Sequence, residues 1–237
     1  RAMQLAGPVA ELLGQLRDRV LAANRFDPAT STRAFTVCLS DVGSYVLWPK
    51  IVQRVSRAAP SVALRMQVLP QSDIAHALET AAIDVAVGAH TELPRALYQR
   101  RLFERRYVVL MRTGHLLEKA RMSAAGFARA SHVVVRLSSG IQEKVDDILG
   151  QQGLHRSATL EMPSYLMIPP LLEVSDYIAV LPGQLADAFS AKGGVRARPL
   201  PIALPPSVIR LFWHRRFLED PGNVWLRGQI VDLFGRV

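Results

Sequence analysis

The sequence is poor in cysteine and in long apolar runs. Its 237 residues contain one cysteine, Cys38, which excludes a disulfide framework and a thiolate metal cluster. No apolar stretch approaches the roughly 18 residues needed to cross a bilayer. No signal-peptide core follows Arg1. Since a cleaved signal would leave no trace, export stays an open alternative.

The motifs of the common enzyme classes are also missing. The sequence has no Gly-x-Ser-x-Gly elbow, no Gly-x-Gly-x-x-Gly fingerprint, no phosphate loop and no His-Glu-x-x-His motif. The six histidines lack the helical spacing of metal ligands. Cys38 lies within a predicted strand, where an inert buried thiol is the usual case. We therefore expect no catalytic residue, no metal and no cofactor.

Positive charge is in excess but evenly spread. The 29 Lys+Arg and 20 Asp+Glu residues give a formal net charge of +9. Residues 1–60, 61–120, 121–180 and 181–237 hold 8, 8, 5 and 8 of the basic residues, so no block concentrates the charge. A nucleic-acid-binding surface needs such a concentration. The charge distribution therefore predicts a solvated surface.

The spacing of apolar residues predicts a repeated strand–helix order. Alternation predicts strands over residues 35–39, 62–68 and 83–87, with helical spacing between them. The stretch from Arg100 to Arg112 is predicted as one long strand, after which the strand–helix order restarts. Repeated βα units with short connections predict the α/β class, with mostly parallel sheets covered on both faces. Two such blocks predict two lobes.

An amphipathic helix is predicted before this pattern. Apolar residues recur at three- and four-residue steps from Leu5 to Val20, within residues 1–24. The segment Asp27–Thr32 then ends the helix as a linker. An apolar stripe with nothing after it to cover it favours pairing with a second chain. The alternative is a helix folded back on its own domain.

Small hydroxyl residues follow predicted strands in both blocks. Ligands of parallel α/β sheets bind at the carboxyl ends of the strands, so we expect a polar cleft between the lobes. The alternative is that these residues are plain helix N-caps, and the charge of Asp41 argues against an anion directly beside it. The candidate residues of these strand-end segments, including neighbours of the hydroxyl residues, are Ser40, Asp41, Gly43 and Ser44 in the first block, and Ser138, Ser139, Ser164 and Tyr165 in the second.

Several short segments stand in a characteristic order and spacing, and these are Ala59–Pro60, Ala82–Gly88, Arg106–Met111 with Gly114–His115, and Asp176–Pro182. Together they resemble the effector-binding domain of LysR-type transcriptional regulators. The resemblance covers about residues 32–236. Further segments resemble the branch of salicylate- and nitroaromatic-responsive and nodulation regulators, and these are Leu39–Gly43, Arg100–Phe103, Phe212–His214 and Asp220–Arg227.

The resemblance implies two Rossmann-like lobes around a central cleft, a fold like that of type 2 periplasmic binding proteins. It implies that residues 1–31 are the end of a linker and dimerisation helix together with the linker after it, that residues 32–112 with 214–237 form lobe I, and that residues 113–213 form lobe II. It also implies a cytoplasmic homo-oligomer that contacts RNA polymerase but no membrane. Promoter DNA would be bound through a winged helix-turn-helix domain upstream of this chain.

The resemblance further implies a small aromatic, carboxylate-bearing inducer between the lobes. Phe212 and Tyr165 would sandwich its ring. The donors for its carboxylate would be Ser138, Ser139, His214 or Arg136. The full predicted site is Ser40, Asp41, Gly43, Ser44, Arg136, Ser138, Ser139, Ser164, Tyr165, Phe212 and His214. The alternatives left open are an exported solute-binding protein of the same fold and a small hydrolase or isomerase.

Overall fold

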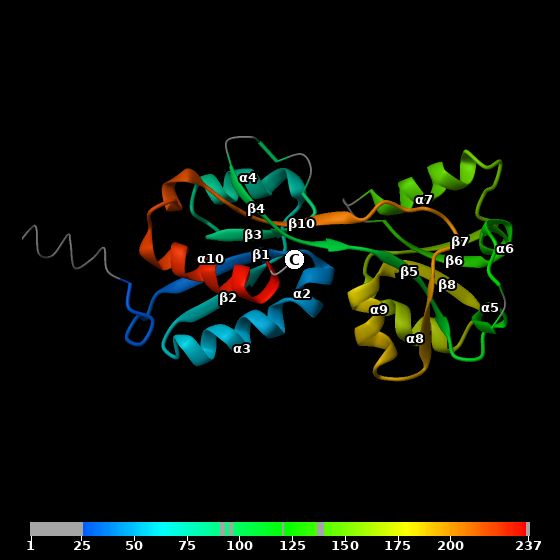
Figure 1. Ribbon diagram of the computed structural model, residues 1–237, viewed down its shortest axis with the longest axis horizontal. Helices are drawn as coiled ribbons and strands as arrows, with labels where there is room; N and C mark the ends of the chain where they lie inside the picture. The colour runs from blue at the N-terminus through cyan, green and yellow to red at the C-terminus, as the bar shows by residue number, and fades with distance from the viewer. Residues whose placement is uncertain (1–25, 91–92, 95–96, 120, 137–139, 236–237) are drawn as a thin grey trace, which may run out of the picture.

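The chain forms two lobes that lie side by side (Figure 1). The computed structural model describes residues 26–90, 93–94, 97–119, 121–136 and 140–235. Each lobe contains one five-stranded sheet with helices on its faces, which confirms the predicted α/β class and the two lobes. The predicted amphipathic helix lies outside the described residues.

Lobe I carries the sheet of strand order β2-β1-β3-β10-β4. Its helices α3 and α10 cover one face of this sheet and α4 covers the other. The elements of lobe I are β1 (Ala34–Leu39), α2 (Asp41–Val46), α3 (Trp48–Ala58), β2 (Ala63–Gln67), α4 (Gln71–Glu79), β3 (Val85–Gly88), β4 (Tyr98–Arg105), β10 (Ser207–Trp213), the 3-10 helix η2 (Arg215–Phe217) and α10 (Pro221–Phe234).

Lobe II carries the sheet of strand order β7-β6-β8-β5-β9. Helices α8 and α9 pack on one face and α6 and α7 on the other. The elements of lobe II are β5 (Tyr107–Arg112), α5 (Leu116–Lys119), α6 (Ala124–Arg129), β6 (Ser131–Val135), α7 (Ile141–Gly150), β7 (Ala158–Met162), the 3-10 helix η1 (Tyr165–Met167), α8 (Ile168–Glu173), β8 (Tyr177–Pro182), α9 (Gly183–Ser190) and β9 (Val195–Pro199). The sequence spacing did not predict α5, α6, α9 or β9.

Each sheet is mostly parallel, with one strand reversed. In lobe I, β10 pairs antiparallel with both β3 and β4. In lobe II, β5 pairs antiparallel with both β8 and β9. The two reversed strands are those that begin just after the chain has crossed from the other lobe. The reversal therefore follows from the connection between the lobes, while the βα units within each lobe remain parallel.

The chain crosses between the lobes twice, and this corrects two predictions. The single strand predicted from Arg100 to Arg112 is wrong, because β4 ends at Arg105, β5 begins at Tyr107, and the two belong to different sheets. The second crossing runs through residues 200–206. The predicted lobe boundaries at residues 112 and 213 assign β5 to lobe I and β10 to lobe II, whereas the sheets hold these strands the other way round.

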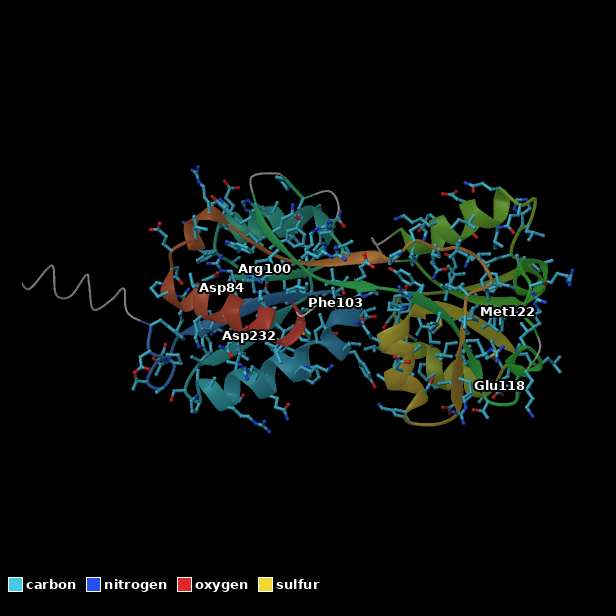
Figure 2. The ribbon with its side chains drawn as sticks, viewed as in Figure 1. Asp84, Arg100, Phe103, Glu118, Met122 and Asp232 are labelled. Carbon is cyan, nitrogen blue, oxygen red and sulfur yellow. The ribbon has the colours of Figure 1, made fainter. Side chains whose placement is uncertain are left out.

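Helix α2 packs against both lobes. Val42 on α2 is buried in the same apolar cluster as Leu185 and Phe189 of α9, and Tyr45 packs against this cluster. The Tyr45 and Phe189 rings meet edge-to-face, with their centroids 5.4 Å apart. Burying side chains of this size contributes about 1.5–3 kcal/mol each. Figure 1 shows α2 at the junction, and Figure 2 places the labelled Phe103 of β4 near it.

No helix in the described part of the chain is both long enough and apolar enough to cross a membrane.

A buried histidine in lobe II makes the fold sensitive to acid. His132 on β6 is 0% exposed, its Nε2 lies 2.8 Å from the Phe127 carbonyl oxygen, and its ring packs edge-on against the Phe127 ring. Burial lowers the pKa of His132 to about 4. An unfolded histidine titrates near pH 6.5. The unfolded chain therefore takes up this proton first as the pH falls.

We predict that the free energy of unfolding falls by about 2 kcal/mol between pH 7 and pH 5 through His132 alone. The stabilising contribution is complete above pH 6.5 and is lost as the pH falls toward 4. Urea denaturation at the two pH values measures this loss. His132→Gln should reduce it, and the matched control His155→Gln, at an exposed position, should keep it. Equal losses in the wild type and His132→Gln would contradict the prediction.

Candidate functional site

A cavity of about 360 Å³ lies at the junction of the two lobes. It opens at the carboxyl ends of β1, β2 and β3, where ligands of parallel α/β sheets bind. The described residues contain no group of three or more His, Cys, Asp or Glu side chains placed to hold a metal ion. The lining residues are Cys38, Leu39, Ser40, Asp41, Val42, Val68, Leu69, Pro70, Gln71, Ile74, Ala89, His90, Arg105, Tyr107, Tyr165 and Pro182.

Arg105 is the buried cation of this cavity. Its side chain lies at the last position of β4, the residue is 7% exposed, and Nε has no hydrogen-bond partner among the described residues. Burial lowers the pKa of the Arg105 guanidinium. An arginine nevertheless stays charged in a protein, and a buried charge without a counter-charge is strongly unfavourable. An anion bound beside Arg105 would supply the missing counter-charge.

Strand geometry explains why Arg105 and Tyr107 both face the cavity while Arg106 does not. Side chains two residues apart point to the same side of an extended chain. Arg105 and Tyr107 are buried, and Arg106 between them is exposed. The Tyr107 hydroxyl lies 2.8 Å from the Ser207 hydroxyl, which joins the two crossing segments. The crossing of the chain between the lobes thus places the cation at the cavity wall.

Asp41 links the cavity to lobe II. Its Oδ2 accepts hydrogen bonds from Ser164 Oγ at 3.0 Å and from the Tyr165 backbone N–H at 3.1 Å. Ser40 is the N-cap of α2, and its Oγ accepts a hydrogen bond from the Gly43 N–H at 3.2 Å. The first residues of α2 therefore connect the two lobes at the edge of the cavity.

Burial favours the neutral form of three further groups of the cavity, His90, Tyr165 and Cys38. Burial lowers the pKa of His90, and the charge of Arg105 lowers it further. Burial also raises the pKa of Tyr165 and of the Cys38 thiol. The His90 ring lies over Gly88, where a Cβ would collide with it, and its Nε2 has no hydrogen-bond partner among the described residues. His90 can therefore donate or accept one further hydrogen bond.

The structure brings three of the predicted site residues to the cavity: Ser40, Asp41 and Tyr165. Ser164 is adjacent, where its hydroxyl is bound to Asp41. Gly43 and Ser44 lie further along α2, and Ser44 Oγ donates to the Asp41 carbonyl oxygen at 2.6 Å.

Three other predicted residues lie away from the cavity lining. Phe212 is buried behind His90, with 5.8 Å between the ring centroids, and does not face Tyr165 across the cavity. His214 caps η2, since its Nδ1 accepts from the Arg216 N–H. Arg136 is 44% exposed in its side chain and is paired with Glu161 and Glu143. Ser138 and Ser139 lie outside the described residues.

The sequence analysis missed Arg105, His90, Tyr107 and Gln71 as lining residues. In the sequence, Arg105 and Arg106 form one of several adjacent arginine pairs and nothing distinguishes them. In the folded chain, Arg105 is buried and Arg106 is exposed. A usable signal was present in the alternation Arg105–Tyr107 at the start of an apolar strand. His90 lies three residues after the predicted strand of residues 83–87, near the carboxyl end of that strand, and could have been found by the same rule as Ser40.

Comparison with known proteins places these features in a family. The family model described as LysR substrate binding domain matches residues 29–235. The chain is 35% identical to the HTH-type transcriptional activator NagR of Ralstonia sp over 234 residues, covering 98% of this chain and 77% of that protein. It is 31% identical to the HTH-type transcriptional activator NahR of Pseudomonas putida over 233 residues, covering 98% and 78%.

A nodulation regulator and a solved structure extend the comparison. Nodulation protein D 2 of Bradyrhizobium sp. (strain NC92) is 30% identical over 239 residues, covering 100% of this chain and 70% of that protein. The crystal structure of the regulatory domain of MexT, a transcriptional activator in Pseudomonas aeruginosa, superposes with a TM-score of 0.76 at 26% identity, covering 87% of this chain and 100% of that chain. The two-lobed chain with its interlobe cavity therefore belongs to the effector-binding domains of the LysR-type transcriptional regulators.

Proposed function

We propose that this chain senses a small aromatic monocarboxylate that binds between its two lobes. The buried Arg105, with Nε unpaired among the described residues, is the observation that carries this proposal. A guanidinium binds a carboxylate through two parallel hydrogen bonds and gains most where water is excluded. A carboxylate ligand would supply the counter-charge that Arg105 lacks in the described structure.

The rest of the cavity supports an aromatic ligand. Val68, Leu69 and Ile74 contribute aliphatic surface, and Tyr107 and Tyr165 contribute rings. Its volume of about 360 Å³ is within the range of small-molecule sites. His90 contributes an uncharged ring to the cavity lining. An apolar cavity with a few polar groups binds and orients a ring that bears one carboxylate.

The proposed response is a change in the arrangement of the lobes. The cavity walls come from both lobes, and Asp41 and Tyr165 line it while also joining the lobes. A ligand shifts the arrangement only as far as its affinity differs between the two arrangements. In the proposed regulator, which acts in the cytoplasm as an oligomer on promoter DNA, this shift alters the geometry of the oligomer and its contact with RNA polymerase.

Rival functions receive less support. The relatives NagR and NahR are transcriptional activators, which does not favour an exported solute-binding protein. The same relatives favour a non-catalytic role over a hydrolase or isomerase. The one thiol of the described lining, Cys38, has its pKa raised by burial, which does not favour Cys38 as a nucleophile.

Aromatic monocarboxylates should raise the melting temperature of the chain. A ligand at one hundred times its dissociation constant adds about 2.7 kcal/mol of stability, which for a domain of this size corresponds to about 5–10 °C. Differential scanning fluorimetry with benzoate and its hydroxy-substituted forms measures the shift. The uncharged benzamide is the matched control and should give a much smaller shift. No shift with any of these acids at millimolar concentration would count against an aromatic acid as effector.

Arg105→Gln should weaken the binding of such an acid by about 10- to 100-fold, because one charge-assisted pair contributes about 1.5–3 kcal/mol. Isothermal titration calorimetry of both proteins measures the change. The matched control is Arg101→Gln on the same strand, at an exposed arginine paired with Glu104. An unchanged dissociation constant in Arg105→Gln would show that the carboxylate is bound elsewhere.

A further inference from the structure

The cavity contains two opposite formal charges at separate places. Of the described lining residues, Arg105 carries a positive charge and Asp41 a negative one. His90, Tyr165 and Cys38 are held neutral for the reasons given above. Among the described residues, neither Arg105 nor Asp41 takes part in an ion pair. A ligand therefore meets an uncompensated cation at one place and an uncompensated carboxylate at another.

The carboxylate of Asp41 is fixed at the cavity. Both of its hydrogen bonds to lobe II fall on Oδ2, one from Ser164 Oγ and one from the Tyr165 N–H. Its backbone is held by the Ser44 hydroxyl, which donates to the Asp41 carbonyl oxygen. The next residue, Val42, is 4% exposed and is packed in the core of lobe II. Rotating the carboxylate into solvent would break these contacts, so a ligand cannot readily displace the charge.

We propose that Asp41 is a specificity-determining residue that makes the cavity reject ligands with a second negative charge. This inference rests on the proposed function, in which the first carboxylate of the ligand pairs with Arg105. A second carboxylate that points toward Asp41 meets a fixed like charge in a partly buried site, where screening by water is weak. A neutral or hydrogen-bond-donating substituent at that place meets an acceptor instead. The cavity thus selects monoanionic over dianionic aromatic acids.

The proposal can be tested with wild-type protein alone. The probes are terephthalate and isophthalate, each compared with its own monomethyl ester, which keeps the shape of the acid and removes one charge. Isothermal titration calorimetry should show that at least one monoester binds at least tenfold more tightly than the corresponding diacid. Equal affinity of ester and diacid for both isomers would overturn the inference.

A substitution isolates the contribution of Asp41. Asp41→Asn removes the charge and keeps an oxygen acceptor for Ser164 Oγ and the Tyr165 N–H. The ratio of the diacid to the monoester dissociation constants should fall at least tenfold in Asp41→Asn. It should stay unchanged in Asp73→Asn, which makes the same change in net charge at an exposed position on the neighbouring helix α4. A ratio that stays within twofold of the wild-type value in Asp41→Asn would overturn the role assigned to Asp41.

The binding results also distinguish a failure of the proposed function from a failure of the inference about Asp41. If benzoate, the monoesters and the diacids all fail to bind both the wild type and Asp41→Asn, the cavity is not a site for aromatic acids, and the inference is overturned with the function on which it rests. If benzoate binds and the ester and diacid affinities remain equal, only the inference is overturned.

Discussion

The double crossing of the chain between the two sheets is the constraint on which the site depends. The chain leaves β4 at Arg105 and enters β5 at Tyr107, so one exposed residue separates two strands of different sheets. The alternation of an extended chain turns both side chains to the cavity. The returning segment is tied to the same place through the hydroxyl groups of Tyr107 and Ser207. The cation therefore lies where any movement of one lobe against the other changes its surroundings.

Helix α2 adds a second connection of a different kind. It belongs to lobe I by sequence, yet Val42 and Tyr45 pack against the core of lobe II. The edge of α2 also supplies Asp41, which binds the first turn of η1. Apolar packing and two hydrogen bonds thus hold the lobes together beside the cavity. A ligand that fills the cavity acts on this junction directly, which is the physical basis of the proposed response.

The sequence alone predicted the parts of the fold that depend on local spacing. Strands such as β1 and β3 were found because alternation of apolar residues marks buried strands. The break at Arg106 was not found, because a strand that ends in one sheet and a strand that begins in the next have the same local pattern. The two lobes were therefore predicted, and the sheet membership of β5 and β10 was not.

The candidate site likewise contains residues that a local sequence rule predicts and residues that it misses. Ser40 and Asp41 were predicted because they follow a strand at its carboxyl end, which is a local rule. Arg136 was expected only from the family resemblance, as a donor to the carboxylate, and it is exposed and paired with two glutamates. Arg105 was missed because burial, rather than residue type, distinguishes it from the other arginines. Burial is decided by the packing of two lobes and is not readable from one strand.

A crystal structure of the chain with a bound aromatic monocarboxylate tests the central claim most directly. The account predicts the ligand carboxylate within about 3 Å of the Arg105 guanidinium nitrogens, with the ring among the apolar side chains of the interlobe cavity and its far end toward Asp41. A ligand bound in another part of the chain, or one whose carboxylate faces Asp41 and leaves Arg105 unpaired, would contradict it.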